Sequence, residues 1–111
     1  MSVEVLENIT LEEKIKKELF EHGIYPDLSG YGYILEAVKI IDGHRKQNRR
    51  YKLMYIYQLI AIKFDAINNS SVERAIRYIR DILIEKGHIE SMTTGRFLAR
   101  LQSDCLWIDN E

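Results

Sequence analysis

Several features that would place this chain in a common protein class are scarce or missing. The 111 residues include one proline and one cysteine, and a single cysteine, Cys105, excludes a disulfide within the chain. No apolar run approaches the roughly 20 residues that a membrane-spanning helix needs. Residues 1–10 are acidic and lack the basic start and apolar middle of a signal peptide. We therefore expect a cytoplasmic protein with no membrane role.

The motifs of catalytic and metal-binding proteins are also missing. His22, His44 and His88 share no short ligand spacing with Cys105 or with one another, which predicts surface or capping histidines and no metal site. There is no Gly-rich phosphate loop after a strand, no nucleophile elbow and no recognisable carboxylate pair. Cys105 precedes the apolar residues 106–108, which favours a buried thiol over a nucleophile. We expect no enzyme, no cofactor and no small-molecule substrate.

The residues that are present indicate an all-α fold. With 46% hydrophobic and 30% charged residues, the chain fits one domain, residues 1–111, of about five helices. Thr10 and Glu13 form a capping box that begins the first helix, and Gly23 ends it. Its apolar stripe is Leu11, Ile15 and Leu19.

A second helix is expected from about residue 29 or 30 to residue 42, with Gly43 closing it. Its expected buried residues are Tyr31, Ile34, Leu35, Val38 and Ile41. A last helix is expected over about residues 94–107, with Phe97, Leu98, Leu101, Cys105 and Ile108 as its apolar stripe. Near its end, Trp107 and Ile108 either cover the core or serve a dimer contact, and Ile84 raises the same alternative.

Two helical patterns in the middle of the chain predict a helix-turn-helix. The first covers roughly residues 52–64, with Met54 or Tyr55, Leu59, Ile62 and Phe64 as candidate anchors and with Ala61 allowing close approach. The intervening segment holds Asp65, Asn68 and Asn69, which favour a turn. The second pattern covers residues 70–86 and ends at Gly87. Its expected capping box is Ser70 with Glu73.

The two faces of the second pattern differ sharply. Val72, Ile76, Ile79 and Leu83 fall at helical spacing and must be buried. The remaining side and the helix start carry Ser70, Ser71, Glu73, Arg74, Arg77, Tyr78 and Asp81. This composition predicts a recognition helix in the major groove of DNA. The alternative is a solvated face whose charges are ordinary i,i+4 neighbours.

Positive charge is concentrated where this motif lies. Residues 39–100 carry thirteen Lys or Arg and six acids, whereas the flanking segments are acidic. Residues 44–52 have no acid and hold five cations: Arg45, Lys46, Arg49, Arg50 and Lys52. We interpret them as a loop that contacts DNA phosphates; the alternative is a solvated interhelical loop.

Three stretches together resemble a known family. SSVERAIRYIRDILIEKG, the preceding YQLIAIKFDAINN and the upstream IYPDLSGYGYILEAVKII are similar to the C-terminal DNA-binding effector domain of the master sporulation response regulator of spore-forming Gram-positive bacteria. The resemblance covers about residues 11–89, and VERAIR and GYxYxxEA are its most specific parts. It implies a helix-turn-helix transcription factor that binds short boxes in double-stranded DNA, often as tandem copies.

The resemblance also implies roles for individual residues and partners. Glu73, Arg74 and Arg77 match the family's motif, whereas Ser71 stands where the family has a DNA-contacting arginine and Tyr78 replaces a histidine. The region after Ile89, which touches RNA polymerase in the family, is shorter here. The family's receiver domain is expected to be absent, so phosphorylation would not switch this chain.

Two functions remain open at this point. The first is a DNA-binding transcriptional regulator, with RNA polymerase or another regulator as a further partner and a homodimer as one possible form. The second is a protein-interaction module, such as an adaptor or phage-type inhibitor, built on a helix-turn-helix scaffold. They differ in whether Arg74 and Arg77 share one electropositive surface with residues 45–52 or are masked by acids such as Glu73 and Asp81.

Overall fold

The computed structural model describes residues 10–108, and these form five helices and no strand. The helices are α2 (Leu11–Glu21), α3 (Ser29–Lys46), α4 (Leu53–Lys63), α5 (Asn69–Glu85) and α6 (Thr94–Gln102). The predicted all-α class is confirmed. None of these helices is both long and apolar enough to cross a membrane.

Helix α2 has the termini that its sequence predicts. The Thr10 hydroxyl accepts a hydrogen bond from the Glu13 backbone N–H at 3.1 Å. At the other end Gly23 adopts a left-handed conformation with φ 81°, and the Ile24 N–H returns to the Leu19 carbonyl oxygen at 2.8 Å. Both devices satisfy backbone groups that a helix end leaves unpaired.

Helix α3 is longer than its sequence suggests. It continues through Gly43 to Lys46, so the predicted end at Asp42 is wrong. Glycine only weakens a helix, by about 1 kcal/mol relative to alanine, and the positive charges of Arg45 and Lys46 favour the last turn. The helix ends where Asn48 takes φ 55°. Of the expected core residues Tyr31, Ile34, Val38 and Ile41 are buried, while Leu35 is partly buried.

Helix α4 faces the core with a different side than expected. The residues that it buries are Ile56, Tyr57, Ile60 and Ala61. The candidate anchors Met54, Tyr55, Ile62 and Phe64 are exposed, and Leu59 is only partly buried, so this prediction is wrong. The error has a simple cause, because α4 is apolar on every side and its sequence does not favour one face.

Helix α5 buries the predicted stripe of Val72, Ile76, Ile79 and Leu83. Its start differs from the prediction, because the N-cap is Asn68 and the capping box pairs Asn68 with Ser71. The Asn68 Oδ1 accepts from the Ser71 N–H at 2.9 Å, and the Ser71 Oγ accepts from the Asn68 N–H at 3.3 Å. Ser70 and Glu73 therefore do not cap the helix. Gly87, with φ 78°, ends it as expected.

The last helix stops five residues earlier than predicted. Helix α6 ends at Gln102, and Asp104 follows with φ 60°. Phe97, Leu98 and Leu101 are buried as expected. Cys105 is exposed, which corrects the prediction of a buried thiol. Residues 103–108, here called the C-terminal segment, bury Leu106 and leave Ile108 exposed.

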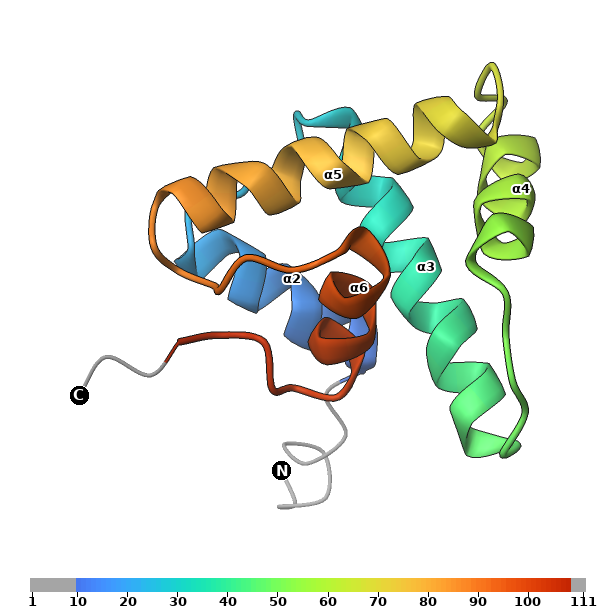
Figure 1. Ribbon diagram of the computed structural model, residues 1–111, viewed down its shortest axis with the longest axis horizontal. Coiled ribbons are helices and arrows are strands. Elements are labelled where there is room, and N and C mark those ends of the chain that lie inside the picture. Colours follow the sequence, from blue (N-terminus) through green and yellow to red (C-terminus); the bar gives the residue numbers. More distant parts are fainter. Residues whose placement is uncertain (1–9, 109–111) are drawn as a thin grey trace, which may run out of the picture.

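Helix α3 lies at the centre of the arrangement. It begins behind the middle of α5 and runs down between α6 and α4 (Figure 1). Gly30 lies so close to α5 that a Cβ atom there would overlap the Ala75 carbonyl oxygen. The core consists of buried side chains from all five helices, together with Ile24, Ile89 and Leu106.

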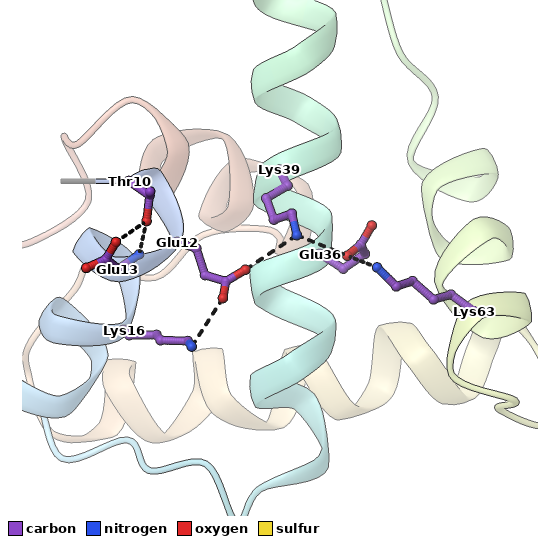
Figure 2. Close-up of polar contacts among 7 residues, drawn as sticks. All are labelled: Thr10, Glu12, Glu13, Lys16, Glu36, Lys39 and Lys63. Carbon is purple, nitrogen blue, oxygen red and sulfur yellow. Dashed lines mark hydrogen bonds and ion pairs between the residues drawn. The ribbon is translucent and has the colours of Figure 1, made fainter. Parts of the chain in front are cut away.

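A chain of charges connects α2, α3 and α4 on the surface (Figure 2). Glu12 pairs with Lys16 at 3.1 Å and with Lys39 at 3.4 Å. Glu36, whose side chain is mostly covered, pairs with Lys39 at 3.8 Å and with Lys63 at 2.8 Å. Because Lys63 lies in the last turn of α4, this chain helps to fix α4 against α3.

Candidate nucleic-acid interface

The helix pair α4 and α5 is compatible with a helix-turn-helix. The two helices pack against each other and are joined by the five residues 64–68. Asp65 takes φ 55°, and the Ala66 N–H returns to the Ala61 carbonyl oxygen at 2.8 Å. Aspartate tolerates this left-handed conformation better than most residues, which explains how the turn forms without glycine.

The outer face of α5 presents the residues that the sequence assigned to DNA. Ser70, Arg74, Arg77 and Tyr78 are all exposed. Arg74 has no ion-pair partner among residues 10–108. It lines a shallow hollow of about 350 Å³, between the starts of α3 and α5, with Ser29, Ser71, Ala75 and Tyr78. An arginine and a tyrosine beside a hollow on an exposed helix can contact an external polar ligand.

Ser71 and Glu73 are held within the protein. The Ser71 hydroxyl donates to the Asn68 carbonyl oxygen at 2.7 Å as part of the N-cap. The Glu73 Oε2 accepts from the Thr94 hydroxyl at 2.8 Å. Burial raises the pKa of Tyr57 to about 12, and the Glu73 carboxylate adds to this rise.

Acids partly mask the cations of α5. The Arg77 guanidinium lies 3.8 Å from the Glu73 carboxylate; because this separation is long and the Arg77 side chain is exposed, the contact is weak. Arg80 pairs with Asp81 at 2.7 Å and reaches the Thr94 hydroxyl at 3.4 Å. The sequence prediction did not include Arg80. Its spacing of seven residues from Glu73 could have placed both on the edge that faces α6.

The five cations of residues 44–52 have several internal partners. Arg45 and Lys46 belong to the last turn of α3, which corrects the expected loop. Arg45 donates to Gln102 at 2.7 Å, and Lys46 pairs with Asp42 at 3.1 Å. Arg49 donates to Gln47 at 3.1 Å. Arg50 and Lys52 are exposed and have no ion-pair partner among residues 10–108.

The start of α3 lies behind the middle of α5, whereas its end lies far from α5, and from there the chain runs back to the start of α4 (Figure 1). Helix α3 has 18 residues and is therefore about 27 Å long. Its start touches α5 and its end carries Arg45 and Lys46. Within one chain, Arg45 and Lys46 therefore lie at the end of α3 that is remote from α5, and they do not share one continuous basic surface with Arg74 and Arg77.

The histidines form an arrangement that sequence spacing did not reveal. The His22 and His88 rings meet edge to face, with centroids 4.9 Å apart, and the His22 ring stacks on Trp107 at 3.7 Å. The Trp107 Nε1 donates to the Glu18 carboxylate at 3.1 Å. Trp107 thus covers the core in this chain. No group of three potential metal ligands occurs among the described residues.

A family model supplies the identification. The model described as "Sporulation initiation factor Spo0A C terminal" matches residues 13–103. The resemblance expected for residues 11–89 is confirmed, and the match extends it through α6. Comparison with curated proteins and with solved structures gives no match. Residues 13–103 include all of α3, α4, α5 and α6 and nearly all of α2, so this chain belongs to the Spo0A C-terminal family.

Proposed function

We propose that this protein is a sequence-specific transcriptional regulator that binds double-stranded DNA with α5 in the major groove. The family is a DNA-binding regulatory domain and not an enzyme family, and its regulatory context is sporulation. The observation that carries the finer proposal is the exposed face of α5, where Arg74, Arg77 and Tyr78 project from a helix whose opposite face is fully buried.

Arg74 is the residue to which we assign base reading. It is exposed, lies in the first half of α5 and has no acidic partner in the described part of the chain. A guanidinium that forks onto guanine O6 and N7 discriminates against a wrong base by about 1–3 kcal/mol. Arg77 and Tyr78 lie on the next turn and would contact the same groove or its phosphates.

Ser70, Ser71 and Glu73 have different expected shares in DNA binding. Ser70 is exposed at the start of α5 and can donate to a phosphate at the groove edge. Ser71 and Glu73 already have partners within the chain, so we expect them to orient the helix start and Arg77 and to contact DNA less directly.

The basic residues 45–52 keep their predicted phosphate role as a proposal. Arg50 and Lys52 are exposed and have neither an ion-pair partner nor a side-chain hydrogen bond in the described region, and they can neutralise phosphates if DNA comes near them. The length of α4 lies between Lys52 and the turn to α5, so a duplex placed on α5 needs a further feature to bring it to this segment.

Fluorescence anisotropy on a labelled duplex with the family's box, beside a scrambled duplex and over a salt series, tests the proposal. We expect the box to be bound more tightly and binding to weaken steeply with salt. Arg74→Ala should weaken box binding about 5- to 150-fold and remove discrimination. Arg49→Ala is the matched control, which should leave discrimination unchanged. The proposal is wrong if neither duplex is bound at low salt.

A further inference from the structure

Helix α4 is apolar on all its sides although only one side is packed. Its eleven residues, LMYIYQLIAIK, include one glutamine, one lysine and no acid. The buried side consists of Ile56, Tyr57, Ile60 and Ala61. A helix that is hydrophobic all round is normally buried all round. The opposite side of α4 therefore lacks a partner among residues 10–108.

The uncovered residues form one continuous surface. Met54, Gln58 and Ile62 lie on successive turns, with Tyr55 and Leu59 in the adjacent row, and we call these five residues the outer stripe. Met54 is 63% exposed, Tyr55 54% and Ile62 71%. Beyond the end of α4, Ile67 is 92% exposed and lines the same hollow as Gln58 and Ile62.

The size of this surface suits a weak but specific interface. Three large apolar side chains of the outer stripe and the adjacent Ile67 are half or more exposed, and together they present on the order of 400 Å², which is typical of the largest patch on a monomer. Two such patches with their surrounding polar residues bury on the order of 1,000 Å², the lower limit for a specific protein interface. The outer stripe is therefore large enough to support association.

The charged residues beside the outer stripe favour a second copy of this chain as the partner. Lys52 precedes α4 and Asp65 follows it, and both are exposed without an ion-pair partner among residues 10–108. The centre of the outer stripe falls between Gln58 and Leu59. Lys52 and Asp65 are equally far from this centre along the sequence. Reversing the helix direction therefore places Lys52 of one copy opposite Asp65 of another. Antiparallel helices also align opposite ends of their dipoles. Such self-complementarity is the property of a two-fold interface.

We propose that the outer stripe of α4 docks against the same stripe of a second copy of this chain, with the two α4 helices antiparallel. Tyr55 of each copy then faces Ile62 of the other, and Gln58 and Leu59 lie beside the two-fold axis. The exposed face of α5 is a different surface and takes no part in this contact. The dimer is thus independent of DNA, and either proposal can fail alone.

Sedimentation velocity of the full chain without DNA tests the dimer, from about 1 µM to about 1 mM, the range in which an interface near this size limit associates. We expect the mass to rise from monomer to dimer. Ile62→Glu should raise the dissociation constant about tenfold or more, because it places a carboxylate in the apolar contact. Phe20→Glu is the matched control at an exposed aromatic of α2, 66% exposed, and should leave association unchanged.

The charge arrangement gives a second, independent test. Lys52→Glu should weaken the dimer, because the new carboxylate faces Asp65 of the other copy. Asp65→Asn, which keeps a side chain that tolerates the left-handed conformation, should remove most of that penalty. In a Cys105→Ser background, Gln58→Cys should form an intermolecular disulfide on mild oxidation, whereas Phe20→Cys should not.

Circular dichroism and thermal melting establish that each variant is folded before its mass is compared. A chain that stays monomeric over the whole range overturns the proposal and leaves the outer stripe for a different protein. A dimer that Ile62→Glu does not weaken also overturns it, because the contact must then lie elsewhere. If Lys52→Glu weakens the dimer equally with and without Asp65→Asn, the two residues do not face each other and the antiparallel register is wrong.

Discussion

Gly30 is the residue at which the two longest helices come closest. The α3 backbone approaches the Ala75 carbonyl of α5 so closely that no Cβ atom fits between them. Gly30→Ala should therefore push α3 away from α5 and lower the free energy of unfolding by about 1–3 kcal/mol or more. Gly43→Ala is the matched control. It lies in the same helix with no neighbour within 4 Å, and should raise stability by about 0.5–1 kcal/mol. Urea unfolding measures both; equal shifts would contradict the close contact.

A second prediction at this scale concerns the start of α5. Asn68→Ala removes the acceptor for the Ser71 N–H, and loss of such a cap costs about 1 kcal/mol. Ser70→Ala, at the position that the sequence pattern favoured as the cap, should change stability by less than about 0.5 kcal/mol. Thermal unfolding of the two variants distinguishes the caps, and a larger loss for Ser70→Ala would reverse the assignment.

At the scale of the helix, the buried side could be predicted from the sequence only where the two sides of a segment differ clearly in polarity. Helix α5 alternates apolar and charged residues so clearly that its buried stripe and its exposed arginines were both predictable. Helix α4 is apolar on both sides, so periodicity could not determine which side packs. Periodicity alone therefore allows Met54 and Ile62 as anchors, although both are exposed and belong to the outer stripe that we propose as a dimer contact.

A helix end could be predicted where a single residue is suited to cap or stop the helix. It could not be predicted where several neighbouring residues are equally suited. Gly23 and Gly87 end their helices by adopting positive φ, as expected. Gly43 also suggests a helix end, but α3 continues to Lys46 and the chain turns at Asn48. The segment NNSS offers several caps, and sequence alone did not favour Asn68. The partners of Ser71 and Glu73 depend on these local choices and on α6, so the composition of the site could be predicted but not its internal contacts.

The ends of α2 and α5 are joined by the C-terminal segment, and this junction should respond to pH. The Ile108 N–H donates to the His88 carbonyl oxygen at 3.0 Å, and Trp107 stacks on His22. Burial lowers the pKa of His88 below its usual value of 6.5, and the charges of His22 and Lys86 lower it further. Burial also raises the pKa of Glu18, whose carboxylate accepts from the Trp107 Nε1.

The sign of the effect follows from linkage. A histidine with a lowered folded-state pKa favours the neutral ring in the fold, so stability is complete above pH 6.5 and declines as the pH falls below it. Glu18 acts in the opposite direction, because protonation of a carboxyl with a raised pKa favours the fold. His88→Gln should therefore reduce the loss of stability between about pH 7.5 and pH 5.5. Urea midpoints of wild type and variant at both pH values measure this, and an identical loss in both would exclude His88 as its source.

At the scale of the whole molecule, the two proposals together give the basic segment a place near DNA. Within one chain, Lys52 is the N-cap of α4, and the length of α4 separates it from the turn that leads into α5. In the antiparallel pair, the chain that enters one α4 at Lys52 lies beside the chain that leaves the other α4 at Asp65, and α5 begins four residues later, at Asn69. If both proposals hold, residues 44–52 of one copy lie beside the start of α5 of the other.

Arg50 should consequently contact phosphate only in the dimer. In the wild-type protein, Arg50→Ala should reduce the slope of log affinity against log salt by about 0.9, the value for one lost phosphate contact. In the Ile62→Glu background, which we expect to be monomeric, the same substitution should leave the slope unchanged. Anisotropy salt series on the four proteins, each also measured by sedimentation, provide the comparison. An equal loss in both backgrounds would mean that Arg50 reaches DNA from its own chain. No loss in either, with dimer and box binding intact, would place the duplex away from the basic segment.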